Sequence, residues 1–131
     1  TTLWEFIHTF KPGSKYDVAV GKIKSMDHHF WGDIAAWYIT YIAGIRINEE
    51  LDDIYRVDVS PYFVKQLDQA EARHEMPYGT VVSSWQRLNE KQISLFVSLP
   101  EGAHGQLKLH DGWKCDDTKL CGGKKFLVTR D

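Results

Sequence analysis

The clearest pattern in the chain is an apolar stripe at helical spacing between residues 33 and 45. Its members recur at i, i+3, i+4, i+7, i+8 and i+11 and are Ile34, Trp37, Tyr38, Tyr41, Ile42 and Ile45. This spacing predicts an amphipathic helix, with Asp33 in its first turn and Gly44 at its end. One such helix cannot bury its apolar face alone, so we expect it to pack on the rest of the chain, on a second copy or on other helices.

Beyond an acidic segment at residues 48–53, the pattern changes to alternation with period two. Alternating runs fall at residues 55–59, 80–88 and 93–99, and shorter ones at 106–109 and 126–129. Asn89-Glu90-Lys91 separates two of them as a hairpin turn. Runs at this spacing, with Gly and Pro between them, predict an antiparallel β-sandwich. The expected fold is therefore mostly β, with a helical piece at residues 1–48 and a C-terminal sandwich at residues 49–131.

Composition narrows the class of function. The 131 residues carry a formal net charge of -2, which gives no basic field for nucleic acid. The longest apolar run, residues 34–43, is shorter than the roughly 18 residues that a membrane helix needs. Aromatic residues make up 13% of the chain, with five Trp. Rings at this density are found in sugar-binding sites and equally in ordinary cores.

Two segments near the N-terminus carry candidate chemistry. Glu5 stands between Trp4 and Phe6, and an aromatic neighbour that excludes water raises a carboxyl pKa toward the range of an acid or base. Its alternative is a surface glutamate. The second segment, Asp27-His28-His29, places two imidazoles beside a carboxylate. They are either sugar-binding or structural histidines.

No metal or other cofactor is expected. Adjacent histidines point in different directions, and no third ligand stands near His28 and His29 at a zinc-like spacing. Cys115 and Cys121 also lack such a neighbour, so a small-loop disulfide or two free thiols are both open.

Four segments together resemble the C-terminal end of the α-L-rhamnosidases of glycoside hydrolase family 78. Thr1-Thr2-Leu3-Trp4-Glu5 resembles a Thr-Thr-x-Trp-Glu phrase of that family, and residues 25–32 resemble its Ser-x-Asn-His-x-x-x-Gly phrase. The helix ending in Ala43-Gly44-Ile45 is similar to one that closes the family's (α/α)6 barrel. Residues 77–100 resemble its terminal β-sandwich. The resemblance covers about residues 1–113, and it departs from the family at Asp27, where Asn is usual.

The resemblance implies a role for each matching residue. Glu5 would be the general base of an inverting exo-glycosidase for terminal α-L-rhamnosides, while His28 and Trp4 would bind the sugar. An inverting enzyme also needs a general acid on the opposite side of the bond. In the family that acid lies upstream, so this chain is expected to be a catalytically incomplete fragment of a bacterial enzyme. Its implied partners are rhamnose-containing glycans or glycosides and an N-terminal catalytic barrel.

Two other classes of function remain open. The first is a stand-alone β-sandwich module that binds carbohydrate or a protein partner, with the aromatic helix as a surface for self-association. The second is a nuclease or metal hydrolase built on Asp27, His28 and His29, which would require a bound metal. The compartment is open as well, between the cytoplasm and the periplasm or exterior of a bacterium.

Overall fold

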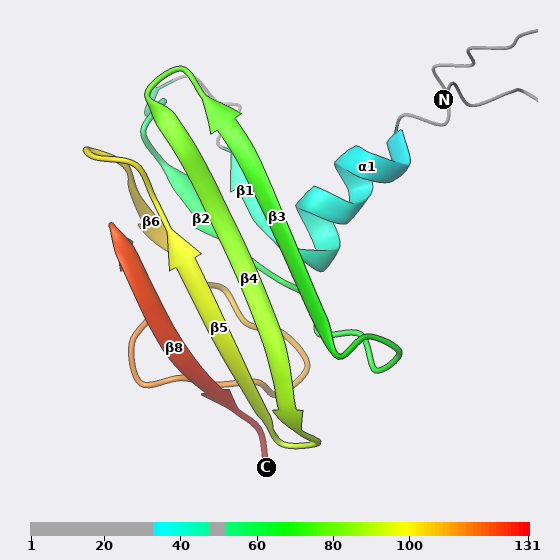
Figure 1. Cartoon of the computed structure of the whole chain (residues 1–131). Coiled ribbons are helices and arrows are strands. Elements are labelled where there is room, and N and C mark those ends of the chain that lie inside the picture. The colour runs from blue at the N-terminus through cyan, green and yellow to red at the C-terminus, as the bar shows by residue number, and fades with distance from the viewer. Residues whose placement is uncertain (1–32, 48–51) are drawn as a thin grey trace, which may run out of the picture. The chain divides into compact units, whose positions relative to one another are not determined.

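The computed structural model describes residues 33–47 and 52–131. The chain divides into two compact units, Thr1–Ala36 and Trp37–Asp131, and nearly all described residues belong to the second. The described elements, in chain order, are α1 (Asp33–Trp37), the π-helix η2 (Tyr38–Ile42), β1 (Ile45–Ile47), β2 (Val57–Val59), β3 (Gln69–Met76), β4 (Gly79–Asn89), β5 (Gln92–Ser98), β6 (His104–Gln106), β7 (Lys119–Cys121) and β8 (Gly123–Thr129). The mostly β class with antiparallel sheets and a short preceding helix is confirmed (Figure 1).

The predicted helix begins at Asp33 but is shorter than its apolar stripe. It ends at Ile42, and Ile45 lies in β1 instead. Gly44 ends it as expected, since its φ of 82° is one that side chains other than glycine rarely adopt. A Cβ there would also lie 2.2 Å from the backbone nitrogen of Pro61. The chain therefore turns directly from the helix into a strand.

The largest sheet has four antiparallel strands in the order β3-β4-β5-β8. The predicted runs at 80–88, 93–99 and 126–129 became β4, β5 and β8, and the turn at residues 90–91 joins the first two. The sequence pattern gave no strand at residues 69–76, where β3 forms. Its inward positions are Ala70 and Ala72, which are too small to produce a strong apolar alternation.

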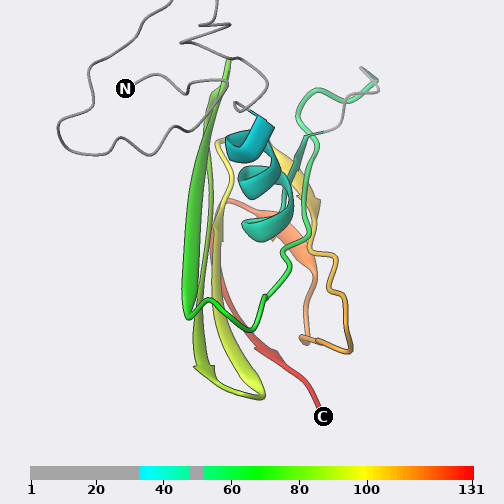
Figure 2. The ribbon, with the colours of Figure 1, turned by 90° about the vertical axis from the view of Figure 1, so that its right-hand side faces the viewer.

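The remaining strands form a second layer that faces this sheet (Figure 2). β1 pairs with β2, and β6 pairs with β7, both antiparallel. Isolated bridges at Arg56–His104 and Val59–Leu107 join β2 to the chain around β6. The backbones of β2 and β6 approach each other closely, so a Cβ on Gly105 would lie only 1.9 Å from the carbonyl oxygen of Val57.

The core lies between the two layers and is organised around Trp85 of β4, which is 1% exposed. Its indole Nε1 donates a hydrogen bond of 2.9 Å to the carbonyl of Ile42. On the same face of β4, the hydroxyl of Ser83 donates to the carbonyl of Ala43 at 2.7 Å. These two bonds satisfy carbonyls at the end of η2, so the four-stranded sheet anchors the end of this helix. Among the described residues, no helix is long and apolar enough to cross a membrane.

Candidate functional site

The residues predicted to carry catalysis lie outside the described part of the chain. Glu5, Trp4 and His28 all fall within residues 1–32, as does Asp27. Whether they come together around a sugar stays a prediction. The candidate functional features that the structure does describe lie in the second unit, residues 37–131.

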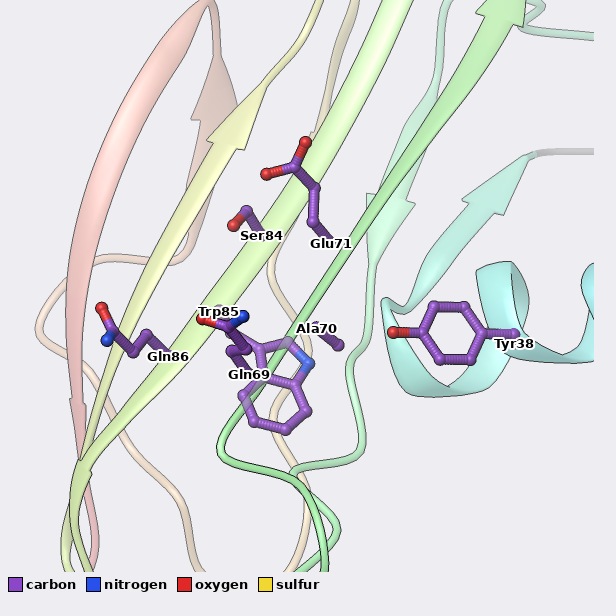
Figure 3. A pocket seen from close by; sticks show the side chains of 7 residues that line it. All are labelled: Tyr38, Gln69, Ala70, Glu71, Ser84, Trp85 and Gln86. Atoms are coloured by element: carbon purple, nitrogen blue, oxygen red, sulfur yellow. The ribbon is translucent and has the colours of Figure 1, made fainter.

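The first feature is a recess of about 300 Å³ over strands β3 and β4 (Figure 3). Three consecutive residues of β3 and their three partners on β4 line it, together with Tyr38 of η2. The lining residues are Tyr38, Gln69, Ala70, Glu71, Ser84, Trp85 and Gln86. Because η2 packs against β3, the Tyr38 hydroxyl points toward that edge strand.

Strand alternation decides which groups the recess presents. Ala70 and Trp85 are buried in the core. The residues before and after each of them along its strand point the opposite way, to the outer face of the sheet; they are Gln69, Glu71, Ser84 and Gln86. One charged group lies among them. The Glu71 carboxylate accepts a hydrogen bond of 3.1 Å from Nε of Arg73, two residues along the same face. Both side chains are at least half exposed, so this ion pair orients the carboxylate more than it stabilises the fold.

The second feature is a row of rings, which we call the aromatic row and define as Trp37, Tyr41, Tyr62 and His110. Successive ring centroids are 5.8, 6.4 and 4.7 Å apart, and the last two rings are stacked within 7° of parallel. Trp37 is 53% exposed and Tyr41 is 39% exposed. The guanidinium of Arg46 lies 4.4 Å from the Tyr41 ring centre. Two exposed members of the predicted apolar stripe therefore lie in this row, and its expected association with a partner stays a prediction.

A third cluster joins the loop before β2 to the start of β6. The carboxylate of Asp53 lies 3.0 Å from Nε2 of His104. The rings of Tyr55 and Tyr78 lie 4.7 Å apart, and the Tyr78 hydroxyl donates to the carbonyl of Ile54. Burial, together with the neighbouring Tyr55 and Asp53, raises the pKa of Tyr78. Tyr78 therefore stays a hydrogen-bond donor at neutral pH, and the cluster is a structural tie.

Asp58 of β2 is the buried carboxylate of the described residues. Burial alone would raise its pKa, but hydrogen bonds from Lys108 and Arg56, and one from the backbone N–H of Gln106, lower the pKa below its usual value. Lys108 Nζ lies 2.7 Å from the carboxylate. The hydrogen bond that Arg56 donates to Asp58 raises the pKa of Arg56. These groups satisfy one another, which is the arrangement of a structural ion pair.

Neither cysteine forms a disulfide, so the free-thiol alternative holds for Cys115 and Cys121. Burial raises the pKa of the Cys115 thiol, which donates to the carbonyl of Asp117 at 2.9 Å. This thiol is therefore a weak nucleophile. Lys124 binds the Asp117 carboxylate and lowers its pKa. Within residues 33–47 and 52–131, no group of three or more His, Cys, Asp or Glu is placed to hold a metal ion.

The recess was not predicted from the sequence. Gln69 and Glu71 lie on the strand that the pattern does not show, and the spacing of Tyr38 marks it only as part of the helical stripe. The weak signal that was present is the alternation of Ala70 and Ala72 with polar residues at 69, 71, 73 and 75. No local pattern could have placed Tyr38 beside them, because that contact joins segments about 30 residues apart.

The comparisons with known proteins agree with one another. A family model described as the bacterial alpha-L-rhamnosidase C-terminal domain matches residues 47–119. Over 136 aligned residues the chain is 26% identical to an alpha-L-rhamnosidase of Formosa agariphila. That alignment covers 100% of this chain and 14% of the relative, so the chain spans about a seventh of that protein's length.

Solved structures share the fold. The alpha-L-rhamnosidase of Dictyoglumus thermophilum superposes with a TM-score of 0.65 at 22% identity, over 82% of this chain and 15% of that one. The alpha-L-rhamnosidase of Streptomyces avermitilis, solved with L-rhamnose, superposes with a TM-score of 0.57 at 21% identity, over 81% of this chain and 11% of that one. At these identities the likeness concerns the fold. Since the family model covers more than half of its residues, the chain belongs to the bacterial α-L-rhamnosidase C-terminal domain family, as the sequence motifs predicted.

Proposed function

We propose that this chain is the C-terminal part of an inverting exo-glycoside hydrolase that acts on terminal α-L-rhamnosides. The observation that carries the proposal is the alignment of the whole chain, including its first 46 residues, with an α-L-rhamnosidase. The family model matches residues 47–119 and therefore covers only the β-rich part of the chain. In the proposed enzyme, residues 1–48 are the last piece of an (α/α)6 catalytic barrel, and residues 49–131 are the β-sandwich that follows it.

The catalytic role falls to Glu5 as general base. Its carboxylate takes a proton from water, which attacks the anomeric carbon while a carboxylic acid on the other side protonates the leaving oxygen. In inverting glycosidases the two carboxyl groups stand roughly 6.5–9.5 Å apart to leave room for the water. His28 holds a hydroxyl of the rhamnose, and Trp4 forms part of the pocket wall. The general acid belongs to a part of the enzyme outside this chain.

Because the general base and the general acid would lie on different parts of the enzyme, we expect the isolated chain to be inactive and a supplied barrel to restore activity. The chain is mixed with a separately expressed upstream barrel, and hydrolysis of an aryl α-L-rhamnoside is followed. Glu5→Gln keeps the shape of the side chain but removes the base, so we expect the rate to fall about 10²–10⁴-fold. Glu101→Gln, an exposed carboxylate in a turn, is the matched control and should leave the rate unchanged. Equal rates for both variants would contradict the role of Glu5.

The second candidate function is a module that binds a partner through the aromatic row. It is favoured by the exposure of Trp37 and Tyr41, which remains after residues 37–131 have folded. Binding of a partner that survives Glu5→Gln and His28→Ala, with no hydrolysis in the mixing experiment, would support the module over the enzyme fragment.

A further inference from the structure

The recess over β3 and β4 has the construction of a binding site for a small ligand. The register places Gln69 opposite Gln86 and Glu71 opposite Ser84. Directly opposed side chains in a sheet lie about 5 Å apart, and neighbours on one face of a strand about 7 Å. Four polar side chains therefore stand at the corners of a rectangle about as wide as a single sugar ring. The Ala70–Trp85 pair lies between them, and Tyr38 of η2 completes the lining beside β3.

The size of the recess restricts the ligand to a small one. Ligand pockets in proteins usually measure roughly 300–1,000 Å³. At about 300 Å³ this recess lies at the lower limit, which matches the size of one monosaccharide unit.

The chemistry of the lining restricts the ligand further. Two amides and two hydroxyls each both donate and accept hydrogen bonds, while the Glu71 carboxylate only accepts. Among the described residues of the lining there is no cationic side chain, so these residues give an anion such as phosphate no counter-charge. Arg73 already balances the Glu71 carboxylate, which removes the attraction for a cation. The groups that suit this set are neutral and carry several hydroxyls at close spacing.

We infer that the recess formed by Tyr38, Gln69, Glu71, Ser84 and Gln86 binds a neutral monosaccharide unit, at a site separate from the one proposed around Glu5. The carboxylate accepts from sugar hydroxyls, and the two opposed amides bind a neighbouring pair of oxygens. The strands that carry these side chains are already paired in the sheet, so binding requires the ordering of side chains and not of backbone. In a glycosidase such a site would hold sugar-rich material near the protein.

Chemical-shift mapping of the complete ¹⁵N-labelled chain tests this assignment without any need for hydrolysis. The probes are L-rhamnose, D-glucose and D-galactose, with inorganic phosphate as the anionic comparison. We expect at least one sugar to shift the amides of residues 69–71 and 84–86 saturably, and phosphate to leave them unchanged. No saturable shift with any of the three sugars, or shifts confined to the aromatic row, would overturn the assignment.

Variants separate the recess from the rest of the surface. Gln86→Ala removes hydrogen bonds to a neutral ligand and should weaken binding about fivefold, while Glu71→Gln removes a charged acceptor and should weaken it about tenfold. Gln106→Ala changes an exposed glutamine of β6 outside the recess, and affinity should stay the same. An equal loss in Gln106→Ala would overturn the proposal. Glu5→Gln should bind as the unchanged chain does, so the hydrolytic proposal and this one can fail separately.

Discussion

At the scale of single residues, the described chain separates groups that hold the fold from groups that face a ligand. Asp58 belongs to the first kind. Its carboxylate is buried in the strand layer opposite the large sheet and accepts from Arg56, Lys108 and the backbone of Gln106. Glu71 belongs to the second kind, since its ion pair is exposed and leaves it at the edge of a recess. Burial and partner count, and not residue type, distinguish the two carboxylates.

Asp58→Asn should make the free energy of unfolding depend less on pH in the acidic range. The folded state lowers the pKa of Asp58 below 3.8, so its contribution is complete above that pH and is lost as the pH falls through the lowered value. At neutral pH we expect a loss of about 1–3 kcal/mol in the free energy of unfolding, measured by denaturant titration. The difference from the unchanged chain should shrink below pH 3.8. Asp116→Asn, at an exposed carboxylate, is the control, and a constant difference at all pH values would contradict this account.

At the scale of elements, the end of η2, which Gly44 sets, is anchored by the sheet. A π-helix of five residues has little stability of its own, and the carbonyls at its end need donors. Ser83 and Trp85, two residues apart on one face of β4, supply them. The same strand presents Ser84 and Gln86 to the opposite face, so a single strand positions both the helix end and the recess.

Ser83→Ala and Ser84→Ala form a matched pair on these two faces of β4. Ser83→Ala leaves the buried carbonyl of Ala43 without its donor, so we expect a loss of about 1–3 kcal/mol in the free energy of unfolding. Ser84→Ala alters a partly exposed hydroxyl and should change stability by about 0.5 kcal/mol or less. Thermal or denaturant unfolding measures both. Similar losses in the two variants would mean that the bond to Ala43 does not anchor the helix end.

At the scale of the whole molecule, the distribution of exposed apolar groups points to association. Within residues 37–131, the helical stripe predicted to need a partner is buried in part, through Ile42 and Ile45, while Trp37 and Tyr41 remain exposed. Apolar surface that stays exposed in one place commonly marks an interface. In the isolated chain, that surface is available to a second copy.

Self-association of the isolated chain should therefore depend on the aromatic row. We expect the Trp37→Ala, Tyr41→Ala double variant to form a weaker dimer than the unchanged chain, with a dissociation constant about tenfold higher or more. Truncating an aromatic anchor commonly costs over 1 kcal/mol of binding free energy. Sedimentation equilibrium measures the dissociation constant of both. Leu127→Ala removes an equally exposed apolar side chain from β8 and serves as control. A purely monomeric chain at all concentrations would refute this prediction.

Much of the fold could be predicted because its signals are local. Long strands with large apolar residues at alternate positions, such as Ile93, Leu95 and Val97, were visible in the pattern, as was the turn between β4 and β5. β3 was missed because alanine fills its buried positions, and the short strands β1 and β7 because three residues carry too little pattern.

The sequence by itself determined the family, the mostly β class and the helix stop at Gly44. The family rests on short motifs in a fixed order, and the class and the helix stop rest on residues close together in the chain, whose spacing or backbone preference acts locally. Only the tertiary structure decided that Tyr38 lies beside β3, that four polar side chains of two strands surround one recess, and that Asp58 is buried among three donors. Those outcomes depend on strand register and layer packing, which bring together residues up to about 50 positions apart. The energy that fixes them comes from burial across the whole core and not from any single segment.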